Sequence, residues 1–379
     1  MIRIPIARPT LGEQEAEAAR AAILSGWVTQ GPRVAEFESR FADHVGAAHA
    51  VAVSSCTAAL HLSLKVAGVG PGDEVVCPSL SFVATANAVV HAGARPVFAD
   101  ADRDTGNLDP ADAERRVTPR TRAILVVHQV GMPADIDAFH ELCAGRGLAL
   151  VEDAACAAGS SYGGRPIGSH SDLVCFSFHP RKVITTGDGG MITTPDAEVA
   201  ARLRRLRHHG MSVSDRARHG ATDLVFEDYL EVGWNYRMTD IQAAVGIVQL
   251  GRLTALVEER RRIAAEYARG FADLPFVRVP REPPDRRTNF QSYVVVLGPD
   301  CPVPRDEVMR RMLAAGVATR RGVMTAHRAT AYREGCAGLR LPVSEDLSDR
   351  GLMLPLFVPM TPEEVGTVVR EFRAAVKAP

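Results

Sequence analysis

Short apolar runs that alternate with helical patterns are the feature that most constrains this chain. A strand that is apolar at nearly every position must be covered on both faces, as in a parallel sheet with helices on either side. The order strand, helix, strand therefore predicts an α/β fold with a largely parallel sheet. The predicted strands are Ala50–Ser54, Glu74–Pro78, Pro96–Asp100, Arg122–His128, Leu148–Asp153, Leu173–Phe178 and Met191–Thr194.

Helical patterns lie between many of these strands and continue after them. The predicted helices between strands include Thr57–Val66, Ala84–His91 and Ile136–Cys143. A longer helical pattern runs from Met238 to about Phe271, and Thr239 or Asp240 is its expected N-cap.

A Pro-rich stretch, Pro275–Pro284, follows the long helix and is typical of a boundary. Beyond it we predict a strand at Tyr293–Leu297 and helices at Arg305–Ala315 and Pro362–Ala375. These elements indicate a second, smaller α/β unit.

Composition excludes several classes of protein. The 379 residues are 46% hydrophobic and 23% charged with a net charge of −1, so no global field recruits nucleic acid or an anionic membrane. We find no apolar run of the ~20 residues that span a bilayer and no signal peptide, so we expect a cytoplasmic protein. The seven cysteines are irregularly spaced without C-x-x-C, which predicts neither a disulfide framework nor a metal site.

Lysine is scarce in this chain. Lys and Arg together number 44, and only Lys65, Lys182 and Lys377 are lysines. Positions that need only a positive charge are therefore mostly Arg, and a retained lysine is a candidate for chemistry that requires an amine.

Lys182 lies in the most informative segment, Phe176–Gly190, between an aromatic strand and a glycine-rich turn. Apolar surroundings disfavour the charged form of a lysine, so we expect a lowered pKa and an amine that can form an imine. Glycines let the backbone approach a flat cofactor, and Ser177 offers a hydroxyl. The alternative is a surface lysine beside a tight turn.

Two other segments carry candidate groups. In Val53–Leu60 a strand ends in small polar residues and a helix begins at once, which makes either an anion site or an ordinary capped helix. In Ala149–Ala155 an apolar strand ends in Glu152 and Asp153, where an acid either holds a protonated nitrogen or a metal, or caps the next turn. Pyridoxal phosphate requires a site for its phosphate, an acid for its ring nitrogen and a reactive lysine, and the three segments together offer these groups.

The chain resembles the DegT/DnrJ/EryC1/StrS family of pyridoxal phosphate-dependent sugar aminotransferases. The resemblance covers nearly the whole sequence, in the family's order. Its motifs are Gly26–Pro32, Ser54–Leu60, Pro78–Thr85, Glu152–Gly159, Phe176–Gly190, Gly233–Ala244, Gly316–Arg320 and Leu354–Phe357.

The resemblance implies an aspartate-aminotransferase-like fold of type I. Its large domain, with a mostly parallel seven-stranded sheet and an N-terminal arm, would span 1–250, and a smaller C-terminal α/β domain would span 251–379.

The resemblance also implies roles for individual residues. Lys182 would bind the cofactor covalently and move the substrate proton, and Asp153 would pair with the pyridine nitrogen. Phe82 would stack on the ring. Asn235 would reach the cofactor phosphate of the other subunit, implying a homodimer. The remaining implied residues are Cys56, Thr57, Ala58 and Ser177 at the phosphate, Cys156 near the phenolic oxygen, and Arg237, Arg321 and His327 near the substrate.

Two departures from the family pattern stand out. Cys56 replaces a common Gly before the phosphate threonine, and Cys156 replaces a common Gln or His three residues after the ring aspartate. Neither removes an essential group. We expect Cys156 to alter the electronics of the cofactor or the choice of amino acceptor.

The expected activity is transfer of an amino group, with glutamate as donor, to the keto group of a nucleotide-linked deoxy sugar. The Arg-rich surface, including Arg202–Arg207, is expected to meet the diphosphate. Alternatives are an aminotransferase for a keto-cyclitol and a ligand-sensing regulator that keeps the fold. A dehydratase of this fold is disfavoured because such enzymes carry His in place of Lys182.

Overall fold

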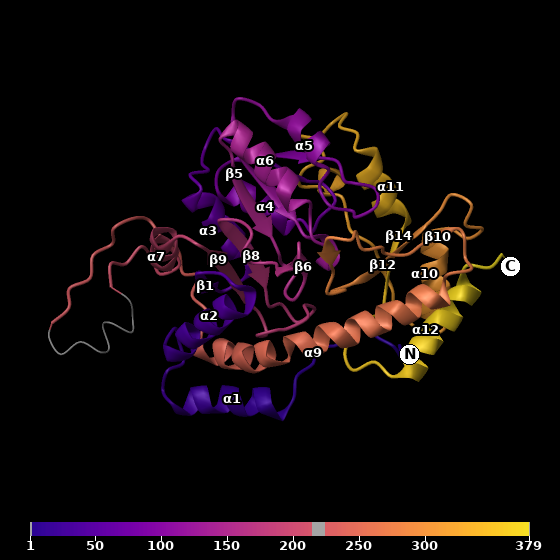
Figure 1. The fold of residues 1–379 in the computed structure, drawn as a ribbon, viewed down its shortest axis with the longest axis horizontal. Coiled ribbons are helices and arrows are strands. Elements are labelled where there is room, and N and C mark those ends of the chain that lie inside the picture. Colours follow the sequence, from indigo (N-terminus) through magenta and orange to yellow (C-terminus); the bar gives the residue numbers. More distant parts are fainter. Residues whose placement is uncertain (1, 214–223, 379) are drawn as a thin grey trace.

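A seven-stranded sheet forms the centre of the computed structural model, which describes residues 2–213 and 224–378 (Figure 1). Its strand order is β1-β9-β8-β5-β4-β2-β3, and only β9 runs antiparallel to its neighbours. The prediction of a mostly parallel sheet is confirmed. The strands are β1 (His49–Val53), β2 (Glu74–Pro78), β3 (Arg95–Ala99), β4 (Thr121–Val127), β5 (Ala149–Asp153), β8 (Leu173–Ser177) and β9 (Gly190–Thr194).

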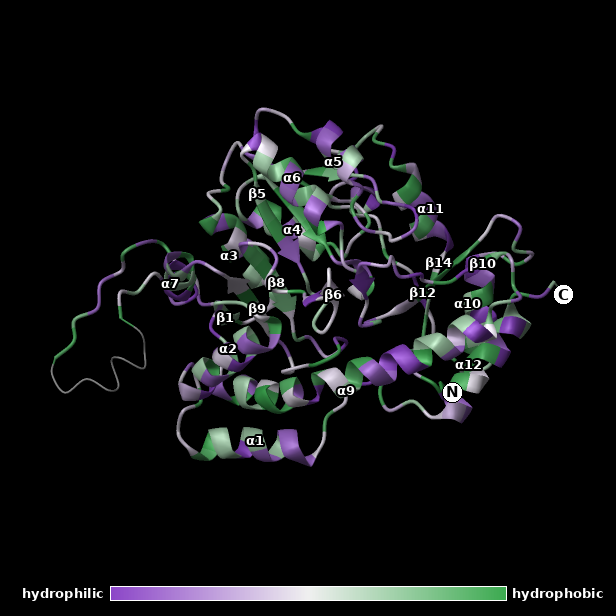
Figure 2. Ribbon diagram, in the orientation of Figure 1, coloured by the Kyte–Doolittle hydropathy of each residue, from purple (hydrophilic) through white to green (hydrophobic). Residues whose placement is uncertain are grey.

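Helices cover both faces of this sheet, and this explains the apolar runs. In β4, Ala123, Leu125 and Val127 face a core shared with α3 and α4, while Ile124 and Val126 face a core shared with α6. Both sets are buried, so the strand is apolar throughout. Figure 2 shows hydrophobic colours along strands at the centre of the large sheet. The helices around the sheet are α2 (Pro32–Val45), α3 (Cys56–Val66), α4 (Ala84–His91), α5 (Pro110–Arg116), α6 (Ile136–Arg146) and α7 (Ala197–Leu206).

The smaller unit is built on an antiparallel four-stranded sheet of order β10-β12-β14-β13. Its elements are β10 (Val277–Arg278), β12 (Tyr293–Leu297), α10 (Arg305–Ala314), β13 (Arg320–Arg321), the 3-10 turn η2 (Ala326–Arg328), α11 (Pro342–Arg350), β14 (Gly351–Leu354) and α12 (Pro362–Ala375). The Pro-rich stretch is more than a linker, because β10 lies inside it.

A small three-stranded sheet of order β11-β6-β7 links the two units. Strands β6 (Ser161–Tyr162) and β7 (Arg165–Pro166) follow β5 in the large unit. Strand β11 (Arg286–Arg287) is the last strand before β12 of the small unit. Strands β6, β7 and β11 have two residues each, which is too short for a periodicity that a sequence pattern could reveal.

The 3-10 turn η1 (Gln129–Gly131) follows β4.

Helix α9 (Asp240–Gly270) connects the two units without a break. Leu250, Leu253 and Val257 pack in the core with α2, whereas Ile263 and Tyr267 pack in the core of the small unit. The expected division at 250/251 therefore falls inside a continuous helix, and the cores change between Val257 and Ile263. Helix α1 (Glu13–Leu24) lies beside the first half of α9 (Figure 1).

By length and composition alone, α9 is the one helix in the described ranges that could cross a membrane. Half of its most apolar stretch is buried inside the protein, and a core helix meets the same criterion.

Asp240 joins the start of α9 to the start of α2. Thr239 is the N-cap of α9, in a capping box with Gln242, so Thr239 fills the predicted capping role. The buried Asp240 carboxylate instead accepts hydrogen bonds from backbone N–H groups at the beginning of α2: Gly31 at 2.7 Å, Val34 at 3.0 Å and Arg33 at 3.0 Å. An anion at a helix N-terminus satisfies unpaired donors and interacts favourably with the helix dipole.

We therefore expect Asp240→Ala to lower the free energy of unfolding by about 2–4 kcal/mol, because two buried donors and one partly buried donor lose their acceptor. Asp196→Ala is the matched control: Asp196 is the exposed N-cap of α7, and its loss should cost about 1 kcal/mol. Urea unfolding of both variants measures the difference. Equal losses would show that the link between α2 and α9 adds nothing to ordinary capping.

Candidate active site

The predicted cofactor residues meet at one edge of the large sheet. Asp153 ends β5 and Ser177 ends β8, both parallel strands, and β1 ends just before α3. Strand β9 begins at this same edge because it runs antiparallel. Ligands of open α/β sheets lie at the carboxyl ends of the parallel strands, which is where these residues are placed.

Only Asp153 of the two strand-end acids is available at this edge. Glu152 is fully buried and accepts a hydrogen bond from His128 Nε2 at 2.7 Å. Burial acts to raise the pKa of Glu152, but the hydrogen bond and charge of His128, together with Ser171 and His170, lower it overall. Glu152 therefore points into the protein interior. Asp153 points the other way, because adjacent residues of a strand face opposite sides of the sheet.

The Asp153 carboxylate is buried and held by three groups. Oδ2 accepts from Thr85 Oγ1 at 2.9 Å, and Oδ1 accepts from the Ala155 N–H at 3.1 Å with the Cys56 thiol 4.0 Å away. Burial raises the pKa of Asp153, while the bonds from Ala155 and Thr85 and the charge of Lys182 limit the rise. A protonated nitrogen at this carboxylate would favour the charged form.

Thr85 is a site residue to which the sequence analysis gave no role. Its hydroxyl donates to Asp153 and accepts from Ser81 Oγ at 2.8 Å. The signal was present, because Thr85 lies three residues after Phe82 in a quoted motif. Its orientation toward a residue 68 positions away could not be read from spacing.

Lys182 lies beside Cys156, with 3.2 Å between Nζ and Sγ. Burial acts to lower the pKa of Lys182, as the apolar sequence context predicts. Cys156, Cys56 and Asp153 act in the opposite direction, and the pKa is raised overall. The expectation of a lowered pKa is therefore wrong for the chain without a ligand, because two thiols and a carboxylate from other loops converge on the amine.

The start of α3 offers donors for an anion. Ser55 is the N-cap and its hydroxyl accepts from the Ala58 N–H at 3.2 Å. In the described part of the chain, the N–H groups of Cys56 and Thr57 meet no acceptor. Two free donors at a helix N-terminus, with the Thr57 hydroxyl beside them, suit a phosphate.

Glycine allows β9 to pass close to this helix start. A Cβ on Gly190 would lie 2.6 Å from the Ser55 carbonyl atoms and 2.8 Å from the Cys56 nitrogen, so a larger residue would displace the helix. Gly190 also pairs with Ser177, whose hydroxyl accepts from the His179 N–H at 3.4 Å. The predicted phosphate residues are thus brought together.

Phe82 is an exposed aromatic side chain near the site, as expected of a ring that stacks on a bound ligand. Its side chain is 59% exposed although it follows β2 closely and the neighbouring Ser81 is buried. The Phe82 carbonyl accepts from the N–H of Thr85, the residue that holds Asp153, and an exposed apolar ring on this turn can cover one face of a flat aromatic group.

Asn235 and Arg237 lie on the segment that enters α9. Asn235 is exposed and forms a β-bridge with His208, while Arg237 is 2.6 Å from His208 Nδ1. Among the described residues, the Asn235 side chain makes no hydrogen bond or ion pair with Lys182 or Asp153. The resemblance gives it a role toward another subunit. That role stays a prediction.

Arg321 and His327 belong to the smaller unit. Arg321 is exposed on β13. His327 is buried, with Nδ1 2.5 Å from Ser79 Oγ and Nε2 3.4 Å from Glu345. Both nitrogens of His327 are therefore engaged: Nδ1 joins the small unit to Ser79, just after β2, whereas Nε2 contacts Glu345 of α11 within the small unit. Its predicted contact with substrate stays a prediction.

The arginines of Arg202–Arg207 are paired within the chain. Arg202 and Arg205 contact Glu231, and Arg204 and Arg207 contact Glu38. This segment is less available to a diphosphate than its sequence suggests. The cause is that carboxylates far along the chain fold onto it.

The group of residues fits pyridoxal phosphate. Free helix donors suit its phosphate, the buried Asp153 suits a protonated ring nitrogen, Phe82 suits the ring face and Lys182 suits the aldehyde. Within the described ranges, no three or more His, Cys, Asp and Glu side chains gather to hold a metal ion. All seven cysteines are free thiols.

We expect Thr85→Val to move the acidic limit of cofactor binding to higher pH by about one unit. The Thr85 hydroxyl lowers the pKa of Asp153, so losing it raises that pKa, and the charged carboxylate that holds the ring disappears at a higher pH. Bound pyridoxal phosphate, measured by absorption from pH 4 to 8, gives the midpoint. Thr85→Ser keeps the hydroxyl and should keep the native midpoint; an equal shift in both variants would contradict this role.

Comparisons with known proteins agree with this geometry. The model of the DegT/DnrJ/EryC1/StrS aminotransferase family matches residues 9–373. A dTDP-4-dehydro-2,3,6-trideoxy-D-glucose 4-aminotransferase of Saccharopolyspora spinosa is 40% identical, with 99% of this chain and 97% of the relative covered. The crystal structure of the aminotransferase TlmJ from Streptoalloteichus hindustanus is 39% identical, with a TM-score of 0.90 and 98% of both chains covered.

A further solved structure bears on the cofactor. The PLP-form of Spr1654 from Streptococcus pneumoniae is 28% identical with a TM-score of 0.91, and 98% of this chain and 97% of that chain are covered. The family match covers nearly the whole chain. The order of the strands and the lysine and acid at the sheet edge agree with it. The chain belongs to the DegT/DnrJ/EryC1/StrS aminotransferase family, and it is a pyridoxal phosphate-dependent aminotransferase.

Proposed function

We propose that this aminotransferase moves the amino group of glutamate to the 4-keto group of a dTDP-linked deoxy sugar, in the biosynthesis of an amino sugar. The observation that carries the proposal is the complete lysine, aspartate and phosphate site in a chain 40% identical over 99% of its length to a dTDP-sugar 4-aminotransferase. The intact Lys182 favours an enzyme over a ligand-sensing regulator.

The residues divide the chemistry between them. The bound cofactor supplies an electron-withdrawing ring that makes the proton on the amine-bearing substrate carbon acidic. Asp153 would keep the ring nitrogen protonated, and Phe82 would lie against the ring. Lys182 Nζ would hold the cofactor and would move the substrate proton.

Lys182 must lose a proton before it acts as a nucleophile or base. In the chain without ligand the raised pKa favours the ammonium form. Cys156 Sγ, 3.2 Å from Nζ, accepts a hydrogen bond from the ammonium and stabilises it, so the proton must leave to water or to a base from solution. A thiol here, where the family pattern commonly has Gln or His, therefore gives the lysine of this chain its own hydrogen-bond partner.

The direct test supplies glutamate and one keto substrate to the purified protein with pyridoxal phosphate. We expect 2-oxoglutarate and an aminated dTDP-sugar from dTDP-4-dehydro-2,3,6-trideoxy-D-glucose, each detected by mass spectrometry, and no product with Lys182→Ala. Amination of a keto-cyclitol with no sugar product would replace the proposed acceptor. The absence of 2-oxoglutarate with every substrate would contradict glutamate as donor.

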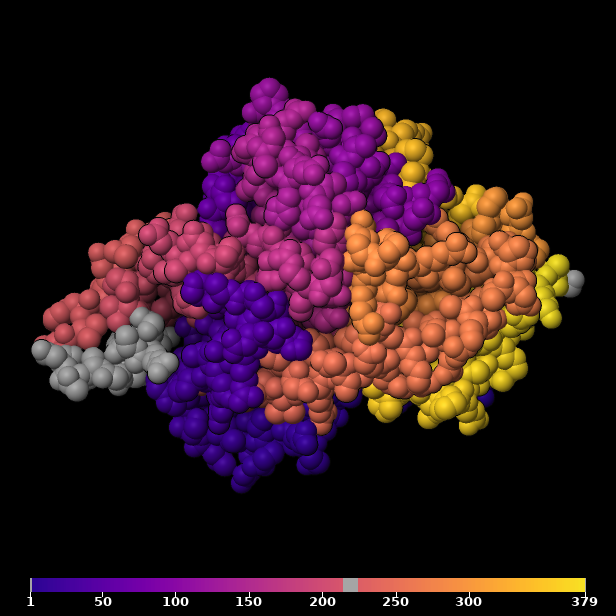
Figure 3. Space-filling model, in the orientation of Figure 1, coloured from indigo at the N-terminus to yellow at the C-terminus, as the bar shows by residue number. Residues whose placement is uncertain are grey.

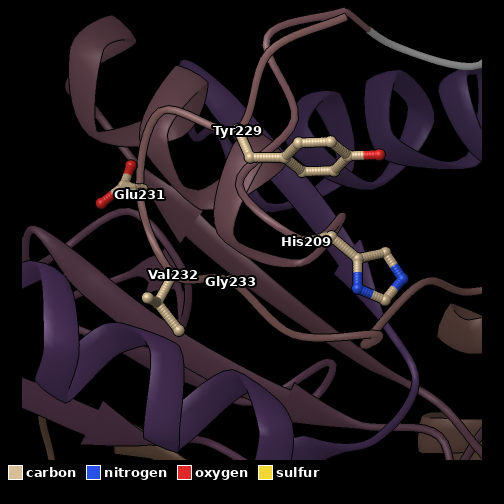
Figure 4. A pocket seen from close by; sticks show the side chains of 5 residues that line it. All are labelled: His209, Tyr229, Glu231, Val232 and Gly233. Atoms are coloured by element: carbon tan, nitrogen blue, oxygen red, sulfur yellow. The ribbon is translucent and has the colours of Figure 1, made fainter.

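We further infer that the active enzyme is a homodimer with shared sites. The described residues that follow α7, 207–213 and 224–232, lie to one side of the body (Figures 1 and 3), and large apolar side chains among them are exposed: Phe226 and Val232 at 86% each and Tyr229 at 58%. Tyr229 and Val232 line a shallow hollow with His209, Glu231 and Gly233 (Figure 4). Asn235 follows this hollow and is exposed, so a second copy could cover the surface and receive Asn235.

Subunit mixing tests this arrangement. Lys182→Ala and Asn235→Ala should each be nearly inactive alone, because each removes one part of every site. If a site takes Lys182 from one subunit and Asn235 from the other, a mixed dimer holds one intact site, and an equal mixture should regain about a quarter of native activity. Glutamate-dependent turnover after unfolding and refolding together measures it. No recovery in proven mixed dimers would show that both residues serve the same subunit's site.

A further inference from the structure

Residues Thr288–Ser292 connect the two units close to the active site, and we call them the interdomain strap. The strap leaves β11, which pairs with β6 of the large unit, and enters β12, a central strand of the small sheet. Phe290 has a φ of 47°, a left-handed backbone that is rare and costly for a bulky residue. A strained residue persists only where surrounding contacts enforce it.

Asn289 is the strap residue that reaches the cofactor site. It is fully buried, and its Nδ2 donates to the Cys156 carbonyl and to the Ala158 carbonyl, both at 2.8 Å. Its Oδ1 accepts from the Gln291 N–H at 2.8 Å, so the orientation of the amide is determined by its partners. A Cβ on Gly131 would come within 2.0 Å of Oδ1, so the turn after β4 leaves room for this side chain.

Gln291 makes the matching contact on the lysine side. Its Nε2 donates to the Arg181 carbonyl at 3.0 Å, and that carbonyl belongs to the peptide that leads into Lys182. The strap thus holds the backbone on both sides of the contact between Cys156 Sγ and Lys182 Nζ.

Arg260 of α9 fixes the strap from behind. Among the described residues, its guanidinium donates to three carbonyls: those of Phe290 at 3.0 Å, Gln291 at 2.5 Å and Leu356 at 3.2 Å. Burial lowers the pKa of Arg260 to about 10. A buried cation retained on three carbonyls indicates that the path of the strap is tightly specified.

We propose that Asn289 is a positioning residue of the active site, which with Gln291 sets the contact between Cys156 and Lys182 from the small unit. The proposal rests on the role of Lys182 in the proposed function and extends it. A shift of Asn289 would move Cys156 relative to the amine, and such small displacements are costly where a reactive group must be aligned.

The competing explanation is that Asn289 only satisfies buried carbonyls. The chain offers a matched control in Asn107, also buried. Its Nδ2 donates to the Met132 carbonyl at 3.1 Å and to the Pro133 carbonyl at 2.8 Å, and its Oδ1 accepts from the Gln129 N–H at 2.8 Å. The hydrogen bonding is the same, but no partner belongs to Cys156 or Lys182.

The test compares Asn289→Leu with Asn107→Leu. Each variant loses three hydrogen bonds of the same kind, and both make the same change of side chain without adding a charge. Gln291→Met is included because Gln291 is only partly buried, so water can replace its bond if Asn289→Leu fails to fold. Melting temperatures of all variants report the purely structural cost.

The first readout is the pH dependence of acetylation of Lys182 in full-length protein freed of cofactor. Lys65 and Lys377 are the only other lysines and serve as internal references. Cys156, Cys56 and Asp153 are the groups that raise the pKa of Lys182, so moving Cys156 away should lower the midpoint by about one pH unit. We expect this in Asn289→Leu and Gln291→Met, with Asn107→Leu at the native midpoint.

The second readout is the rate at which glutamate converts the bound cofactor, per cofactor bound. We expect about tenfold slower conversion in Asn289→Leu than in Asn107→Leu at equal loss of melting temperature, with the KM for glutamate little changed. Identical midpoints and rates in the two Leu variants, with Gln291→Met at native values, would overturn the proposal.

Failure of the proposed function would look different. It would appear as native protein whose bound cofactor does not respond to glutamate. The acetylation midpoints would still decide whether Asn289 positions Cys156, because they are measured without cofactor and without substrate.

Discussion

Burial of the Asp153 carboxylate is the constraint on which the rest of the site depends. A buried anion needs hydrogen bonds and a nearby positive charge, and Thr85, Ala155 and Lys182 provide them. The parallel strands place the carboxylate at the sheet edge. The antiparallel β9 brings Gly190 against the start of α3 there, so the anion donors and the acid lie at the same edge of the sheet.

The site of this chain differs from a generic lysine site in its thiols. Cys156 lies 3.2 Å from the amine and Cys56 lies 4.0 Å from Asp153, so the lysine is surrounded by groups that favour its charged form. The position of Cys156 in turn depends on Asn289, which arrives from the small unit. Chemistry at the sheet edge is therefore tied mechanically to the packing of the two units along α9.

Sequence patterns predicted the elements well because their causes are local. Doubly covered strands are apolar throughout, and Thr239 with Gln242 is a capping box whose two members stand three residues apart. Motif order also located Lys182 and Asp153. What remained hidden depends on contacts between distant residues: Thr85 with Asp153, Asn289 with Cys156, and Glu38 and Glu231 with the arginines around α7. The pKa of Lys182 was misjudged for the same reason, since Cys156 lies 26 residues earlier in the chain.

Covalent attachment of the cofactor tests the central claim most directly. Reduction of the pyridoxal phosphate-loaded protein with borohydride would fix the cofactor on its lysine, and peptide mass spectrometry would then locate it among only three candidates. The account predicts the added mass on Lys182 alone, with none in protein first converted by glutamate. Added mass on Lys65 or Lys377, or none on any lysine of a protein saturated with cofactor, would contradict the assignment of the active site.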